Sequence, residues 1–348
     1  MTVRHRDANA IVPDWDSLAD RVAASPFLRA GWIQAWARAF AGGRVEAITA
    51  EREGAVVGFL PFLRGRRRIA SPANYHSPEF GILAVDADAS RAVAREAFAL
   101  GAGTVVVSFV DASSTGAHAL RAAATAGGYA VAERVRLSSP YVDIHGDWQE
   151  FERRLSPNLR GDVKRRRRRA EETGTLSVDV EDGSQRLAEL LDDGFAVEGS
   201  GWKDAEGTAI RSQPNTLRFY REVAEWAAAR GWLRLAFLRL DGRTIAFHYD
   251  LEADGVLYHL KGGFDTRYER MSPGKVLHYE LLARCFAAGS RRYEFLGGAE
   301  RYKLQFARGT RDLVEIRAFA PGLGGRVEHA VYAYGRPLAR RVRDRVRR

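Results

Sequence analysis

Hydrophobic and polar positions in the first 145 residues alternate between helical and strand periods. Apolar residues three or four apart predict four helices: Asp14–Ala24, Ala30–Phe40, Ser90–Leu100 and Thr115–Ala126. Alternating or continuous apolar runs bounded by turn residues predict five strands: Val45–Glu51, Ala55–Leu63, Phe80–Val85, Thr104–Val110 and Tyr129–Leu137. The first two strands are predicted to form a hairpin across Glu53-Gly54.

The remaining residues repeat this plan. The helices predicted there are two pieces of Asp147–Thr173 separated near Ser156-Pro157, then Arg186–Ala196, Thr216–Ala229 and Pro273–Ala288. The predicted strands are Leu176–Val180, Leu233–Leu240, Thr244–Leu251, Val256–Gly262, Arg292–Leu296 and Val314–Ala320. Three successive strands from Leu233 to Gly262 are expected to form an antiparallel meander.

The two halves share a local pattern. "EGAVVGFLPF" from Glu53 and "DGRTIAFHYD" from Asp241 align as acid, Gly, two residues, β-branched residue, small residue, Phe, and similar elements surround both. We therefore predict an α/β (α+β) protein of two domains, residues 1–145 and 146–348. Each would be a mixed, mostly antiparallel sheet flanked by helices, at an ordinary domain size.

The composition indicates which binding partners and which cellular compartment to expect. The chain is 46% hydrophobic and 28% charged, so it can bury a core, and its net charge of +10 favours anionic partners such as phosphorylated cofactors, RNA or acidic membranes. Its one cysteine, Cys285, lies at helical spacing with Leu277 and Leu281 and is interpreted as core. The N-terminus lacks a signal-peptide pattern, and no window reaches the ~18 apolar residues of a membrane span, so a soluble cytoplasmic protein is the expectation.

The residues Ser272-Pro273-Gly274-Lys275 open the predicted helix Pro273–Ala288 in an unusual way. Ser272 can cap free N–H groups, and Pro273 at the first helical position loses no hydrogen bond. Gly274 is a poor helix former, but it allows a ligand to come close to the backbone. The first-turn N–H groups, the helix dipole and Lys275 together suit an anion. A plain capped helix is the alternative interpretation.

The order of elements and several segments resemble a known family. "GFDTRYERMSPGKVLHYEL" and "FLGGAERYKLQF" are similar to the signature region of CelD/BcsL-type GNAT acetyltransferases, which in turn resemble FemAB peptidyltransferases. "LRGDVKRRRRRAEETG", "FAVEGSGWKDAEGTAI" and "SPANYHSPEFGIL" also resemble segments of that family. The likeness covers most of the chain and is strongest from Glu198 to Phe306. It implies two tandem GNAT-like domains, the second carrying acyltransferase activity.

The resemblance implies an acyl-CoA donor, most simply acetyl-CoA, and a small amine-bearing acceptor. Ser272, Gly274 and Lys275 would hold donor phosphates, and Gly262 and Gly263 would let the acyl chain approach a strand that splays from Arg292–Leu296. Many GNAT enzymes carry a glycine-rich Arg/Gln-x-x-Gly-x-Gly/Ala turn at the pyrophosphate. Here Pro273 removes one N–H donor from that turn, which leaves open another thioester or an ester as donor.

Three residues are candidates for proton transfer in this reaction. Glu198 is the preferred general base, in a loop after a helix with Trp202 near enough in sequence to desolvate it and raise its pKa. Asp265 is the second choice, although a helix cap or a partner for Arg267 would explain it equally well. Tyr302 is the candidate acid for the leaving thiolate. A solvated surface role remains the alternative for Glu198.

Other residues are candidates for contact with the acceptor. From the second domain these are Trp202, Lys203, Tyr268 and Lys303; Tyr302 and Lys303, on an extended segment, would point to opposite faces. His76 would line the acceptor cleft from the first domain, with a satisfied loop histidine as the alternative. The histidines are scattered and show no metal-ligand spacing, so no metal is expected.

Basic segments leave two other functions open. Lys164–Arg169 would surround a helix with six successive cations and lacks interleaved aromatic residues, so a solvated helix is favoured over an RNA site. A Fem-like transfer from aminoacyl-tRNA is nevertheless the second hypothesis, and a non-catalytic protein that binds RNA or a membrane surface is the third. The C-terminal "PLARRVRDRVRR" places Leu338, Val342 and Val346 on one helical side, for packing or for weak contact with an anionic membrane.

Overall fold

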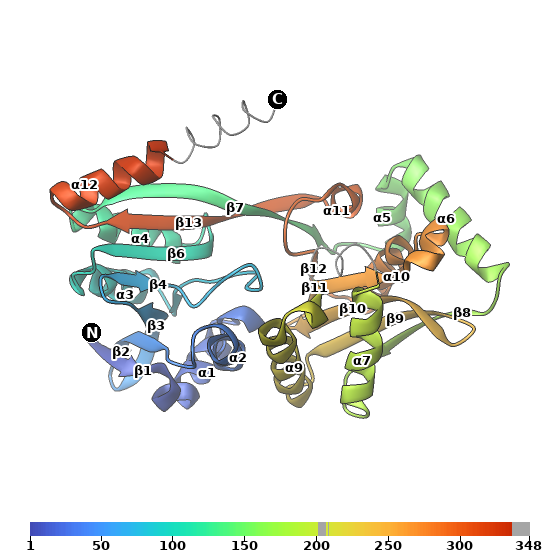
Figure 1. Cartoon of the computed structure of the whole chain (residues 1–348), viewed down its shortest axis with the longest axis horizontal. Helices are drawn as coiled ribbons and strands as arrows, with labels where there is room; N and C mark the ends of the chain where they lie inside the picture. Colours follow the sequence, from blue (N-terminus) through green and yellow to red (C-terminus); the bar gives the residue numbers. More distant parts are fainter. Residues whose placement is uncertain (201–206, 208, 336–348) are drawn as a thin grey trace. The chain divides into compact units, whose positions relative to one another are not determined.

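The computed structural model describes residues 1–200, 207 and 209–335 and divides the chain into two compact units (Figure 1). Unit 1 comprises Met1–Leu137 and the chain from Asp312 onward, and unit 2 comprises Ser138–Arg311. The sequence predicted two consecutive domains with a boundary after residue 145. In the structure most of the last strand, β13 (Gly309–Phe319), belongs to the same unit as the first 137 residues. Within the described residues no helix is long and apolar enough to cross a membrane.

The strands of unit 1 lie in the order β1-β2-β3-β4-β6-β13-β7, with β5 paired to β3. Their bounds are β1 Thr2–Asp7, β2 Glu46–Arg52, β3 Ala55–Arg64, β4 Arg68–Ala70, β5 Leu83–Ala84, β6 Thr104–Asp111, β7 Ala130–Asp143 and β13 Gly309–Phe319. The helices are α1 Val12–Arg21, α2 Ala30–Phe40, α3 Ala87–Ala99, α4 Thr115–Ala126 and α12 Leu323–Ala330. β6 pairs with β4 in parallel and with β13 in antiparallel orientation, so the sheet is mixed.

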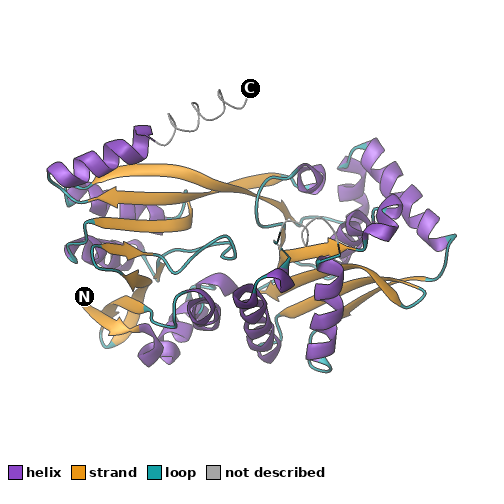
Figure 2. Ribbon diagram, viewed as in Figure 1, coloured by secondary structure: helices purple, strands orange, loops and turns teal. Residues whose placement is uncertain are grey.

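Unit 2 has the sheet order β7-β12-β11-β10-β9-β8, with helices packed on it (Figure 2). Its strands are β8 Leu176–Glu181, β9 Leu233–Leu240, β10 Arg243–Ala253, β11 Val256–Phe264 and β12 Arg292–Glu294. Its helices are α5 Trp148–Arg154, α6 Pro157–Glu171, α7 Leu187–Glu198, α9 Pro214–Ala229, α10 Pro273–Ala287 and α11 Arg301–Phe306. Among the described strands of unit 2, only β11 and β12 pair in parallel. β9 to β11 form an antiparallel meander, and β8 pairs with β9 in antiparallel orientation.

Strand β10 is buried on both faces because helices cover both. Successive side chains of a strand point to opposite faces, so Ala246 and Phe247 face different layers. Ala246 lies in the core cluster that contains Leu277 and Leu281 of α10. Phe247 packs instead against α7, where Gly194 lets the ring come close to the helix backbone. Cys285 is buried in the α10 cluster, and burial raises its pKa to about 12, which confirms its interpretation as core.

Most of the long predicted elements are present, and the errors concern short ones. The predicted strand Phe80–Val85 is reduced to β5, and the predicted strand Arg292–Leu296 ends at Glu294. Strands β1 and β4 and helices α11 and α12 have no counterpart in the prediction. These pieces are too short for a hydrophobic period to be distinguished from chance, and tertiary pairing determines them.

The close packing of α7 on β10 predicts that a side chain added at Gly194 lowers the stability of the fold. A Cβ added at Gly194 would lie 2.3 Å from the Phe247 ring, which is itself fully buried. We therefore expect Gly194→Ala to lower the free energy of unfolding by about 1–3 kcal/mol, as overpacking does. Urea unfolding followed by circular dichroism measures this change.

Gly161→Ala is the matched control, because a Cβ at Gly161 in α6 would meet nothing within 4 Å. It should raise the free energy of unfolding by roughly 0.5–1 kcal/mol through helix propensity alone. Equal stabilisation by both substitutions would contradict the packing of Phe247 against α7.

Candidate active site

The ladder between β11 and β12 stops early. Only three residue pairs form, ending with Tyr258 and Glu294, while β11 continues to Phe264. The family resemblance implied a splayed pair of strands here; in the structure β12 itself ends at Glu294, and β11 continues without it. Beyond the last pair, β11 passes under the end of α7 and then leads into the turn before α10.

At two positions near the end of β11 only glycine fits, because neighbouring atoms leave no room for a Cβ. A Cβ at Gly263 would lie 2.5 Å from Glu198 Cα, so this glycine lets β11 touch the backbone at the end of α7. A Cβ at Gly262 would lie 2.9 Å from both His248 Cδ2 and His259 Cε1. Packing thus accounts for both glycines, whereas their contact with an acyl chain stays a prediction.

A cavity of about 390 Å³ lies between the end of β11 and the first turn of α10. Two of the three predicted proton-transfer residues, Glu198 and Tyr302, line it, and Asp265 does not. All five predicted donor residues line it as well: Gly262, Gly263, Ser272, Gly274 and Lys275. Candidate residues that lie far apart along the sequence therefore line the same cavity within unit 2.

The turn before α10 differs in one respect from the prediction. Ser272 adopts a left-handed conformation (φ +45°), and its side chain makes no capping hydrogen bond. Its carbonyl oxygen instead accepts hydrogen bonds from Lys275 N (3.0 Å) and Val276 N (3.2 Å). Pro273 occupies the first helical position as expected. The nearest atom to a Cβ at Gly274 would be Phe264 Cδ1 at 3.6 Å, so space remains over this residue.

Lys275 is held at the cavity by an ion pair with α6. Its Nζ lies 2.9 Å from Asp162 Oδ2, and Arg166 Nε lies 3.1 Å from the other carboxylate oxygen. Burial by itself would raise the pKa of Asp162, but hydrogen bonds from Lys275 and Arg166 lower it to about 2. The carboxylate is therefore ionised at neutral pH and offsets part of the positive charge beside the turn.

Glu198 is the last residue of α7 and is buried, with 2% of its surface exposed. The alternative of a solvated surface glutamate is therefore wrong. Its Oε2 accepts a hydrogen bond from Ile210 N at 2.9 Å, which orients the carboxylate. Trp202, which was expected to desolvate it, and Lys203 lie outside the described residues.

Tyr302 and Lys303 lie in helix α11, so the extended segment predicted for them is wrong. Tyr302 is 41% exposed, and burial of the rest of its phenol, followed by the nearby charge of Glu300, raises its pKa above the ordinary value of 10. It therefore stays protonated at neutral pH. Lys303 Nζ donates to the Leu296 carbonyl oxygen (2.7 Å) and pairs with Glu300 (2.8 Å), and these contacts do not favour its predicted contact with the acceptor.

Three further candidates have structural roles in the described part of the chain. Asp265 caps the short helix after β11 and binds the Arg267 guanidinium, which lowers its pKa. Tyr268 packs against the core cluster of α10. His76 belongs to unit 1, where its ring stacks on Phe40 with centroids 5.4 Å apart and its backbone N–H donates to Asn74 Oδ1. These contacts favour the capping and loop alternatives over substrate binding.

A cluster of three histidines on the cavity wall was missed. His248 of β10, His259 of β11 and His278 of α10 all line the cavity and are at most 5% exposed. The β10–β11 register shifts between Tyr249 and Asp250, and this β-bulge places His259 opposite Asp250 and Gly262 opposite His248. Burial, helped by the charge of Lys303, lowers the pKa of His278 to about 3, so its ring is neutral.

The basic run on α6 is largely neutralised by neighbouring acids. Lys164 pairs with Glu152, Arg165 and Arg166 with Asp162, Arg167 with Glu171 and Glu280, and Arg168 with Glu172. A solvated, ion-paired helix, which the sequence favoured over an RNA site, is the arrangement found.

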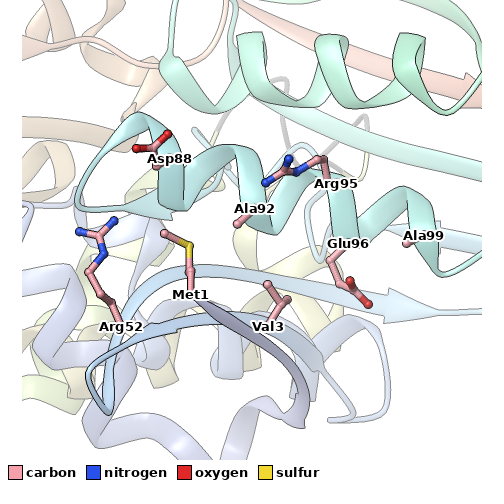
Figure 3. Close-up of a pocket in the computed structure, with 8 residues that line it drawn as sticks. All are labelled: Met1, Val3, Arg52, Asp88, Ala92, Arg95, Glu96 and Ala99. Atoms are coloured by element: carbon pink, nitrogen blue, oxygen red, sulfur yellow. The ribbon is translucent and has the colours of Figure 1, made fainter.

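Unit 1 has a hollow of its own, of about 540 Å³, between β1 and α3 (Figure 3). Several of the charged side chains around it are already paired. Arg52 bonds to Asp86 (2.9 Å), His5 to Glu96 (2.8 Å) and Arg91 to Asp88. At this hollow the first turn of α3 presents the acidic residue Asp88, whereas the first turn of α10 at the cavity of unit 2 presents Gly274 and Lys275.

Comparison with known proteins finds a family model that matches the part of unit 2 holding the cavity. Residues 157–304, which lie within unit 2, match the family model described as acetyltransferase (GNAT) domain. No curated protein shows significant similarity to the chain. The narrower resemblance to CelD/BcsL-type enzymes stays a prediction.

Solved structures share the fold over most of the chain at low sequence identity. They include the C-terminal domain of a protein described as a lysylphosphatidylglycerol synthetase from Agrobacterium fabrum (13% identity, TM-score 0.57, 89% of this chain and 91% of that one). FemX is similar over 91% of this chain and 97% of its own (12% identity, TM-score 0.57). A tandem GNAT protein from the clavulanic acid biosynthesis pathway matches over 92% of this chain and all of its own (12% identity, TM-score 0.50). The chain thus has an α/β fold like that of tandem GNAT proteins, and its residues 157–304 match the GNAT acetyltransferase domain model.

Proposed function

We propose that this protein is an N-acyltransferase that moves an acyl group, in the simplest case acetyl, from acyl-CoA to an amine of a small molecule or sugar. One observation carries the proposal. The predicted donor turn, the end of a splayed strand and two proton-transfer candidates line the same cavity of the GNAT domain.

The donor would lie across the end of β11 and the first turn of α10. Phosphates would face Gly274 and the positive end of the helix dipole, where Lys275 adds charge. Asp162 would compete with those phosphates for Lys275, since it holds the ammonium at 2.9 Å. The thioester would then lie beside Gly262 and Gly263, where β11 has left the ladder with β12.

The reaction requires two proton transfers, and the cavity supplies a group for each. Glu198 takes a proton from the acceptor amine, whose nitrogen lone pair forms a bond to the thioester carbonyl carbon. Backbone N–H groups of β11 stabilise the oxyanion that develops. The carbon–sulfur bond then breaks, the electron pair leaves with sulfur, and Tyr302 gives its proton to the thiolate. The products are an amide and free coenzyme A.

The Fem-like alternative is transfer from aminoacyl-tRNA. Its support is a likeness of fold to FemX at 12% identity. The ion pairs along α6 weigh against it, because a tRNA site needs cations that are available to phosphates. Turnover with aminoacyl-tRNA and none with acyl-CoA would replace the proposal with this alternative.

Gly274→Val tests the donor site. A valine side chain there would fill space over the first turn of α10 while meeting only Phe264 in the protein. We expect acyl-CoA affinity to fall at least about tenfold, or ~1.4 kcal/mol, measured by isothermal titration calorimetry.

Gly161→Val serves as the matched control, since Gly161 is an exposed helical glycine outside the cavity. It should leave acyl-CoA affinity unchanged. Unchanged affinity in a folded Gly274→Val variant would reduce the turn to a plain helix start.

Glu198→Gln tests the general base. Glutamine keeps the size of the side chain and an oxygen to accept from Ile210 N, so the fold should be retained. Turnover should fall by a factor of about 10²–10⁴, and the loss of activity on the acidic side of the pH–rate profile should disappear.

Asp265→Asn is the matched control, because the Asp265 carboxylate is occupied by Arg267 and by capping. It should keep turnover near that of the wild type. The reverse result, loss in Asp265→Asn and near-normal turnover in Glu198→Gln, would assign the base to Asp265.

A further inference from the structure

We propose that His248, His259 and His278 form a binding site for a divalent transition metal ion of the Zn²⁺ class, with one coordination position open to the cavity. The three histidines come from β10, β11 and α10, and one ring nitrogen from each lies within 4.8 Å of the other two. The proposal does not depend on acyl transfer.

Two of the rings are oriented as metal-ligating imidazoles are. His259 Nδ1 lies 2.7 Å from Asp250 Oδ1, and the tautomer that donates from Nδ1 to this oxygen leaves a lone pair on Nε2. His278 Nδ1 lies 3.1 Å from the Tyr293 hydroxyl oxygen. The tautomer that donates from Nδ1 to this oxygen leaves His278 Nε2 available as a ligand.

Asp250 places a buried carboxyl group next to the histidine cluster. Its side chain is fully buried, and its Oδ2 makes no hydrogen bond among the described residues. This oxygen lies 3.8 Å from His248 Nδ1. A buried carboxylate is costly without a compensating charge, and a cation held by the adjacent imidazoles would supply one.

Gly262 keeps the space beside the rings open. A Cβ there would lie 2.9 Å from His248 Cδ2 and 3.2 Å from His259 Nε2, so a side chain would fill the side of the rings that carries these atoms. All three histidines also line the cavity. A metal held by these three ligands would therefore keep its fourth position on the side of the cavity, as in catalytic rather than structural zinc sites.

The donor set selects the class of metal. Three imidazoles suit Zn²⁺, Co²⁺, Ni²⁺ or Cu²⁺, whereas Mg²⁺ and Ca²⁺ prefer oxygen ligands. Tetrahedral zinc with ~2.0–2.1 Å bonds needs ligand nitrogens roughly 3.3 Å apart. The rings must therefore move closer by rotation when the ion binds, starting from the separations of up to 4.8 Å seen here.

The test uses the full-length protein after treatment with a chelator, without donor or acceptor. Zn²⁺ is titrated in competition with a chromophoric chelator, and we expect one ion per chain with a dissociation constant below about 1 µM. Co²⁺ substitution should give visible absorption typical of tetrahedral coordination, and X-ray absorption of the Zn²⁺ form should show three imidazoles. Weaker binding than about 10 µM, or fewer than two imidazoles, would overturn the proposal.

Variants locate the ion. His259→Gln and His278→Gln should each weaken Zn²⁺ binding at least about 100-fold, and Asp250→Asn about 10–100-fold. His5→Gln and His76→Gln, at histidines of unit 1, should leave it unchanged. Retained affinity in the double variant of His259 and His278 would place the ion elsewhere and refute the site. Because zinc binding and acyl-CoA binding are measured separately, failure of one leaves the other standing.

Discussion

The early end of the β11–β12 ladder is the constraint on which the site in unit 2 depends. Pairing ends at Tyr258 and Glu294, and β11 runs on for six more residues. His259 and Gly262 to Phe264, which follow the last pair on β11, line the cavity. With the ladder open, Gly263 can touch the end of α7, Glu198 is brought to the cavity wall, and α10 begins beside it.

Local sequence features predicted the parts of this arrangement that local physics determines. The meander and α10 follow from strand alternation, turn residues and Pro273 at the first helical position. Five donor residues and two of the three proton-transfer candidates, whose roles came from the family resemblance, line one cavity. Lys303 was misplaced because a six-residue helix carries too little periodicity to be recognised, and the loop carbonyl oxygen of Leu296 that holds its ammonium cannot be foreseen.

The histidine cluster could not be predicted for a different reason. His248, His259 and His278 are far apart along the chain and match no ligand spacing. They meet because a β-bulge sets the β10–β11 register and because α10 covers the same face of β10 that carries Ala246 and His248. A bulge is one extra residue, and no residue type marks it in the sequence. The nearest local sign was the Asp250 carboxylate two residues after His248 on the same side of a strand.

The most direct measurement of the central claim is amide hydrogen exchange of the full-length protein with and without saturating acetyl-CoA. If the cavity of unit 2 is the donor site, acetyl-CoA should slow exchange in peptides that span Gly262–Val276, at the end of β11 and the start of α10, and leave peptides of the β2–β3 hairpin in unit 1 unchanged. Protection confined to unit 1, or no protection at any concentration of acetyl-CoA tried, would contradict the account.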